Sequence, residues 1–134
     1  MESLRKILVV DDDPVIRRVL RERLVSAGFQ VLEAADGAPG IALAKQERPV
    51  LILLDIMMPG QGGIETYHAL RQEPATRDIP VIFLSALAQG LVSFKDLEKN
   101  FEVVAKPYDP EKLMRIIQKV LGEPARENQG RLEK

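Results

Sequence analysis

Apolar residues in this chain gather in five short runs, separated by longer segments in which they recur every three or four positions. A short apolar run bounded by turn residues is typical of a buried strand, and the longer spacing is typical of a helix with one apolar face. The predicted strands are residues 5–11, 29–34, 50–55, 80–85 and 101–105. The predicted helices are residues 14–27, 37–48, 64–71, 87–97 and 110–121.

Local signals support these boundaries. Asp13 and Pro14 form a cap followed by proline at the first helical position, where the missing N–H is not needed. Asp109 and Pro110 repeat this pair before the last helix, and Gly28 is a stop signal after the first one. We therefore expect an α/β protein in which strands and helices alternate.

Five strands alternating with five helices predict a doubly wound parallel sheet with helices on both faces, a three-layer sandwich. Right-handed crossovers and coverage of both faces favour the strand order 2-1-3-4-5. This order places the first and third strands side by side at the point where the winding reverses. Ligands of open α/β sheets bind at such a point, beyond the carboxyl ends of the strands.

The length and composition fit one soluble domain. The chain has 134 residues, a formal net charge of -1 and no cysteine, which excludes disulfides and thiolate metal sites and suits the cytoplasm. The charge disfavours a general attraction to nucleic acid or membrane. We expect a domain over residues 1–121 and a flexible tail or linker over residues 122–134, which have little apolar content.

Polar residues that could act together in one site lie at the carboxyl ends of four predicted strands or directly after them. They are Asp11 and Asp12, Asp55, Ser85 and Lys106. Clustered carboxylates repel one another unless a hard divalent cation neutralises them, and Mg²⁺ takes carboxylate ligands while keeping positions for phosphate. The lysine ammonium and the serine hydroxyl can bind phosphoryl oxygens. These residues predict a Mg²⁺-assisted phosphoryl-transfer site in which Asp55 is the nucleophile.

The chain resembles a CheY-like receiver domain of a two-component response regulator, which has the flavodoxin-like fold. The matching segments are ILVVDDD (residues 7–13), LDIMMPG (54–60), LSA (84–86) and KP (106–107). With the order of the elements, the resemblance covers residues 4–121. Five site positions in the right order make it specific.

The resemblance implies a role for each site residue. Asp55 would accept the phosphoryl group and share in binding Mg²⁺. Asp12 would bind Mg²⁺ directly, Asp11 directly or through water, and Met57 through its backbone carbonyl. Ser85 would bond to the phosphoryl group, and Lys106 would be the phosphate-binding lysine.

The family also implies partners. A sensor histidine kinase or a histidine phosphotransferase would donate the phosphoryl group, and the domain would catalyse only its own phosphorylation and dephosphorylation. A downstream protein or a second copy would bind the face formed by the fourth helix (87–97), the fifth strand (101–105) and the fifth helix (110–121). The chain itself would bind neither nucleic acid nor membrane.

The sequence departs from the family pattern in two respects, and two further positions bear on the lifetime of the phosphoryl group. Val103 stands where receivers often have an aromatic residue that reorients on phosphorylation, and the segment from Ser85 to Lys106 is slightly short. Met57 and Leu87 are apolar at positions that flank the phosphate, so neither can orient a hydrolytic water. We expect a long-lived phosphoryl group.

Other classes of protein fit less well. A pseudo-receiver, which keeps the fold and is never phosphorylated, is left open by Val103. A flavodoxin-like electron carrier needs N–H and hydroxyl groups after the first strand, where the aspartates would repel phosphate. No acid/base partner for a hydrolytic phosphatase is evident near Asp55. The arginines of the first helix are interpreted as a solvated face, or alternatively as a docking site for an acidic partner.

Overall fold

A parallel sheet forms the centre of the computed structural model, which describes residues 5–58, 62–85, 101–105 and 109–122. Its strands are β1 (Lys6–Val10), β2 (Gln30–Ala34), β3 (Leu51–Asp55), β4 (Val81–Ser85) and β5 (Phe101–Ala105). Their order in the sheet is β2-β1-β3-β4-β5, and every neighbouring pair is parallel. The predicted strand order is therefore confirmed.

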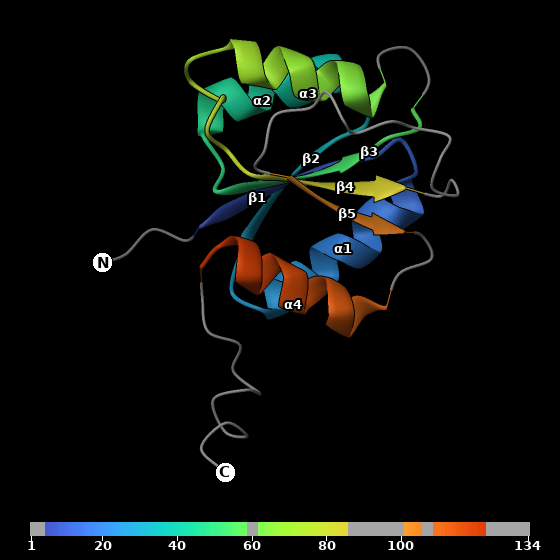
Figure 1. Ribbon diagram of the computed structural model, residues 1–134. Coiled ribbons are helices and arrows are strands. Elements are labelled where there is room, and N and C mark those ends of the chain that lie inside the picture. Colours follow the sequence, from blue (N-terminus) through green and yellow to red (C-terminus); the bar gives the residue numbers. More distant parts are fainter. Residues whose placement is uncertain (1–4, 59–61, 86–100, 106–108, 123–134) are drawn as a thin grey trace.

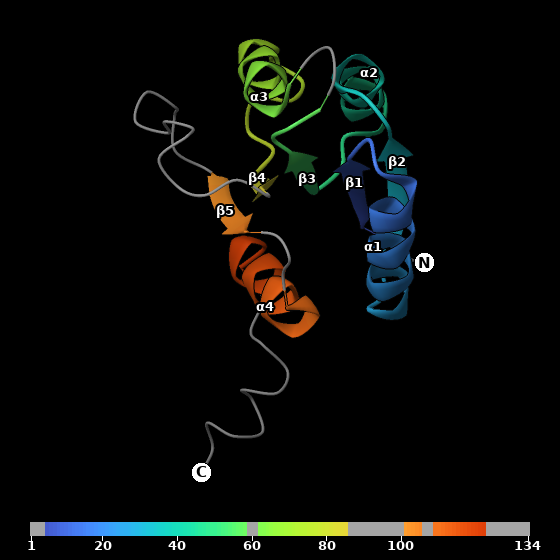
Figure 2. The same cartoon turned by 90° about the vertical axis from the view of Figure 1, so that its right-hand side faces the viewer.

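Helices cover both faces of this sheet. The described helices are α1 (Pro14–Ser26), α2 (Gly37–Glu47), α3 (Gly63–Gln72) and α4 (Pro110–Val120). Helices α1 and α4 lie on one face, and α2 and α3 lie on the other (Figure 1). The same three layers are seen when the sheet is viewed from its end (Figure 2). The helix predicted over residues 87–97 lies outside the described residues, so α4 is the predicted fifth helix.

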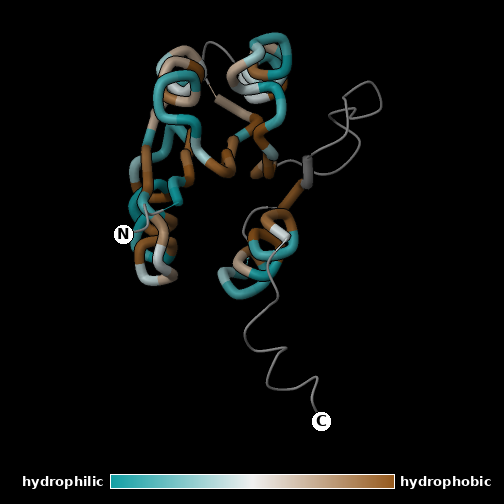
Figure 3. The backbone as a smooth tube through the Cα atoms, turned by 90° about the vertical axis from the view of Figure 1, so that its left-hand side faces the viewer, coloured by the Kyte–Doolittle hydropathy of each residue, from teal (hydrophilic) through white to brown (hydrophobic). Residues whose placement is uncertain are grey.

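The central strands β1, β3 and β4 are largely apolar on both sides because both faces of the sheet are covered. Alternate residues of β1 divide between the two layers: Ile7 and Val9 pack toward α1 and α4, and Leu8 and Val10 pack toward α2 and α3. All residues of β3 are buried. When the backbone is coloured by hydropathy, the strands are largely brown, whereas the helices mix teal with white and brown (Figure 3). Of the described helices, none has the length and apolarity to cross a bilayer.

Caps fix the ends of the helices close to the predicted positions. The Asp13 carboxylate accepts a hydrogen bond from the Val15 N–H, and Pro14 is the first residue of α1. Gly28 follows the end of this helix with a φ of 97°, a conformation that favours glycine. Helix α2 ends before Pro49, as predicted: its last residue is Glu47, and the C-cap residue Arg48 adopts the left-handed conformation with a φ of 50°.

Candidate functional site

The register between β1 and β3 places two aspartates at the same edge of the sheet. The last paired residues are Val10 and Leu54, so Asp11 and Asp55 follow at equivalent positions. Asp11 also extends the pairing between β1 and β2, because its N–H donates to the carbonyl of Ala34 at the end of β2. The two carboxylates thus come from adjacent strands at the point where the winding of the sheet reverses.

Asp12 completes a cluster of three carboxylates. One oxygen from each of Asp11, Asp12 and Asp55 lies within 4.8 Å of the others. Asp11 is fully buried and Asp55 is 4% exposed, whereas Asp12 is exposed to solvent. The structure therefore brings together the three carboxylates that the sequence placed at this edge, and one of them faces water.

Backbone N–H groups orient the two buried carboxylates. The Asp13 N–H donates to Asp11 Oδ1 over 2.9 Å. The Met57 N–H donates to Asp55 Oδ1 over 3.2 Å. Both donors lie two residues after the aspartate they hold, an arrangement in which an aspartate side chain stabilises its own turn. The turns after β1 and β3 are thus each stabilised by a hydrogen bond to the aspartate that precedes them.

The donor set fits a hard divalent cation. Three carboxylates this close repel one another, and Mg²⁺ is bound by a few carboxylate oxygens together with waters and phosphate oxygens. The mixture of buried and exposed ligands would hold the cation at the surface of the sheet edge, where a phosphoryl group can reach it.

The other predicted site residues lie at the same edge or outside the described residues. Ser85 ends β4, one residue beyond Leu84, which pairs with Asp55. Ser85 pairs with Ala105, and Lys106 is the next residue of the sequence but lies outside the described part of the chain. Met57 follows the site with its side chain 54% exposed, whereas Met58 is buried in the core beneath α3.

Gly63, the residue just before the predicted third helix (64–71), is in close contact with the site. A Cβ on Gly63, the first residue of α3, would lie 2.3 Å from the Asp55 carbonyl oxygen. The Gly63 N–H donates to the Ile56 carbonyl, which holds α3 against the end of β3. The pair Gly62-Gly63 in the sequence was the available signal, but the close approach itself depends on how α3 packs.

One arginine of α1, Arg17, differs from the interpretation of these arginines as a solvated face. Arg17 is partly buried and donates to the backbone carbonyl of Asp11 over 2.7 Å. It also binds Glu33 of β2, which no sequence signal connected to the site. Arg18, Arg21 and Arg23 are exposed, as expected for a solvated face.

The doubly wound sheet, with three carboxylates where its winding reverses, defines an open α/β domain of the kind whose ligands bind at this edge. Comparison with known families identifies which family of such domains it is. The family model described as "Response regulator receiver domain" matches residues 7–118. The chain therefore belongs to the response regulator receiver family.

Similar proteins agree with this assignment. The probable transcriptional regulator ycf27 of Porphyridium aerugineum is 39% identical over 117 residues, 87% of this chain and 48% of the relative. The chain thus spans about half the length of such relatives. The structure of chemotaxis protein CheY4 of Vibrio cholerae is 30% identical with a TM-score of 0.81, covering 88% of this chain and 99% of that one.

A solved relative carries a metal. The receiver domain of sensor histidine kinase PA1611 of Pseudomonas aeruginosa is 30% identical with a TM-score of 0.78. The similarity covers 90% of this chain and all of that domain, which has a magnesium ion coordinated in its active site cleft.

Proposed function

We propose that this receiver domain accepts a phosphoryl group on Asp55 in a Mg²⁺-dependent reaction. The observation that carries the proposal is the acidic cluster, in which oxygens of Asp11, Asp12 and Asp55 lie within 4.8 Å of one another. The magnesium ion in the PA1611 receiver domain supports it. Receiver domains are signalling modules, and this one would catalyse only its own phosphorylation and dephosphorylation.

Four residues would hold the metal. Asp11, Asp12 and Asp55 would supply carboxylate oxygens, and Met57 its backbone carbonyl. Bound Mg²⁺ would neutralise the charge of the phosphoryl oxygens, so that an anionic carboxylate can approach the phosphorus.

The chain's own groups would position the nucleophile. The Met57 N–H fixes the Asp55 carboxylate through Oδ1. A carboxylate oxygen of Asp55 would attack the phosphorus of a phosphohistidine, forming an O–P bond as the N–P bond breaks. The imidazole would leave with the electron pair of that bond. Ser85 would donate a hydrogen bond to a phosphoryl oxygen, and Lys106 would bind another as an ammonium.

The donor would be a sensor histidine kinase or a histidine phosphotransferase. Phosphorylation would bias the domain between two states, and the face formed by residues 87–97, β5 and α4 would bind a downstream protein or a second copy. The ycf27 relatives are named as transcriptional regulators, and an output of that kind would belong to a longer protein. We place the domain at residues 1–121, residues 122–134 as a tail or linker, and the protein in the cytoplasm.

Intact-protein mass spectrometry tests the proposal. Wild type and Asp55→Asn are incubated with acetyl phosphate, with and without Mg²⁺. We expect a gain of one phosphoryl group in the wild type only when Mg²⁺ is present, and no gain in Asp55→Asn. Asn keeps the oxygen that accepts the Met57 N–H, so the variant removes the charge while retaining the turn. Phosphorylation of Asp55→Asn to the wild-type level would contradict the proposal.

The pseudo-receiver is the alternative that Val103 leaves open, although Asp55, Ser85 and Lys106 argue against it. Val103 lies on β5 with 36% of its side chain exposed, where the family often has an aromatic residue. A wild type that gains no phosphoryl group and binds neither Mg²⁺ nor beryllofluoride by NMR would be an interaction module with this fold. A Mg²⁺-dependent gain of one phosphoryl group by the wild type would exclude the pseudo-receiver.

A further inference from the structure

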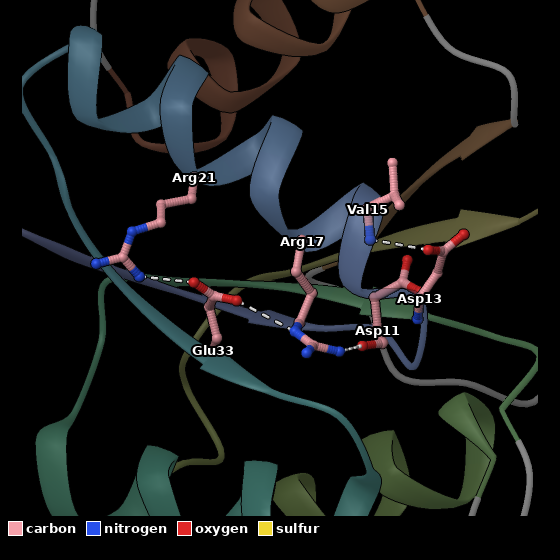
Figure 4. Close-up of polar contacts among 6 residues, drawn as sticks. All are labelled: Asp11, Asp13, Val15, Arg17, Arg21 and Glu33. Atoms are coloured by element: carbon pink, nitrogen blue, oxygen red, sulfur yellow. Dashed lines mark hydrogen bonds and ion pairs between the residues drawn. The ribbon is translucent and has the colours of Figure 1, made fainter.

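Arg17 connects the acidic cluster to β2. Its Nη1 donates to the backbone carbonyl of Asp11 over 2.7 Å, and its Nε lies 3.1 Å from Glu33 Oε1. The guanidinium points back from the first turns of α1 toward the end of β1 (Figure 4). A planar guanidinium can serve two acceptors in fixed directions, which a lysine ammonium does less well.

Glu33 in turn binds a second arginine. Its other oxygen, Oε2, lies 2.6 Å from Arg21 Nη1, one helical turn further along α1. The side chains of Arg17 and Glu33 are 19% and 27% exposed, whereas that of Arg21 is 52% exposed. The Arg17–Glu33 pair is therefore shielded more than an ordinary surface ion pair, whereas the Arg21–Glu33 pair is more open to solvent.

These contacts fix the peptide that joins two of the proposed metal ligands. The Asp11 N–H donates to Ala34, the Asp11 carbonyl accepts from Arg17, and the Asp11 carboxylate accepts from the Asp13 N–H. The carbonyl of Asp11 belongs to the peptide plane that leads into Asp12. The orientation of that plane determines where the exposed Asp12 carboxylate projects relative to Asp11.

We infer that Arg17, held by Glu33, is a positioning residue for the Mg²⁺ site: it orients the Asp11–Asp12 peptide so that both carboxylates face one cation. The inference rests on the proposed function, because it assumes that the cluster binds Mg²⁺. Arg17 donates to a backbone carbonyl and acts through the ligands. Partners that orient metal ligands in this way commonly change metal affinity by about ten-fold or more when they are removed.

The positioning role and the charge of Arg17 predict effects of opposite sign. A positive charge close to an acidic cluster opposes cation binding, so removing the charge by itself would tighten the binding of Mg²⁺. Removing an orienting hydrogen bond would weaken it. The direction of the change in Mg²⁺ affinity therefore separates the two effects.

The experiment is a Mg²⁺ titration of ¹⁵N-labelled protein at constant ionic strength, followed by amide chemical shifts, for the wild type, Arg17→Met and Glu33→Gln. Arg18→Met is the matched control, because it removes the same charge from the next, exposed position of α1. We expect a dissociation constant about ten-fold higher in Arg17→Met. Glu33→Gln should shift in the same direction, and Arg18→Met should bind as tightly as the wild type or more tightly. Urea unfolding without Mg²⁺ reports any loss of stability separately.

The possible results of the titration test the positioning role of Arg17 and the proposed function separately. Saturable binding by the wild type with equal or tighter binding by Arg17→Met overturns the positioning role and leaves the proposed function intact. A wild type that does not bind Mg²⁺ overturns the proposed function and the inference with it. If Arg17→Met does not fold, Glu33→Gln decides, and an unchanged dissociation constant in that variant overturns the inference.

Discussion

Asp11 and Asp55 lie at equivalent positions on neighbouring parallel strands, because the register pairs Val10 with Leu54 immediately before them. Both side chains are almost fully buried, and Asp12 brings a third carboxylate within 4.8 Å. The site is thus a concentration of negative charge that the fold itself imposes. The closeness of the three carboxylates makes them repel one another, and it is also the basis for the proposed binding of Mg²⁺.

The first prediction concerns that cost. Asp55→Asn removes one charge from the cluster and keeps the oxygen that accepts the Met57 N–H. We expect the free energy of unfolding without Mg²⁺ to rise by roughly 1–4 kcal/mol, since two like charges about 4 Å apart repel by about 4 kcal/mol at an effective dielectric constant of about 20 and solvent around the exposed Asp12 weakens this. Urea unfolding with and without Mg²⁺ checks this. Mg²⁺ should stabilise the wild type and lose most of that effect in the variant; equal stabilisation of both would count against the cluster as the metal site.

The second prediction concerns Gly63. A methyl group there would lie 2.3 Å from the Asp55 carbonyl oxygen and 2.7 Å from the Ile56 Cα, so the start of α3 or the end of β3 must shift. We expect Gly63→Ala to lower the free energy of unfolding by about 1–3 kcal/mol through overpacking. Where the variant folds, phosphorylation by acetyl phosphate should slow, because the moved backbone is that of Asp55.

Gly62→Ala is the matched control for this prediction. The nearest atom to a Cβ at Gly62 is 3.5 Å away, an ordinary contact, and the φ of -74° suits any residue. Alanine is a poorer N-cap than glycine, so a loss of up to about 1 kcal/mol is expected from Gly62→Ala. Equal effects of the two substitutions would show that close contact with Asp55 is not the cause.

The third prediction concerns the lifetime of the phosphoryl group. Met57 is 54% exposed directly after the site and has no group that can orient an attacking water. We expect Met57→Asn to speed dephosphorylation several-fold, since the amide can hydrogen-bond to a water near the phosphorus. The loss of phosphoryl mass is followed after removal of acetyl phosphate. Val25→Asn, at the opposite end of α1 from the site, should leave the rate unchanged; a Met57→Asn rate equal to the wild-type rate would show that this position does not control hydrolysis.

The fourth prediction concerns the attachment of α4. Ile117 is fully buried and packs with residues of the sheet and α1 in one cluster. Ile117→Ala should lower the free energy of unfolding by about 2–5 kcal/mol, through lost apolar burial and the cavity left behind. Urea unfolding checks this against Val25→Ala, which is 51% exposed and should change stability by less than about 0.5 kcal/mol. A small effect of Ile117→Ala would mean that α4 adds little to the core.

The sequence by itself determined the strands and helices of the described residues, the order of the strands in the sheet and the edge where the acidic residues meet. Apolar runs that end in Asp11 and Asp55 mark buried parallel strands, and the handedness of crossovers leaves few ways to order them. Caps such as Asp13 with Pro14 are local, so they too can be read from a few neighbouring residues.

Only the tertiary structure decided the contacts between elements that are distant in sequence. Arg17, Glu33 and Asp11 meet because α1 packs across β1 and β2 at a particular rotation and height. Gly63 touches the Asp55 backbone because α3 starts directly against the end of β3. Such contacts depend on how side chains pack across the layers. The periodicity of apolar residues indicates which face of a helix or strand a residue occupies, but it does not specify which residue of the next layer that residue contacts.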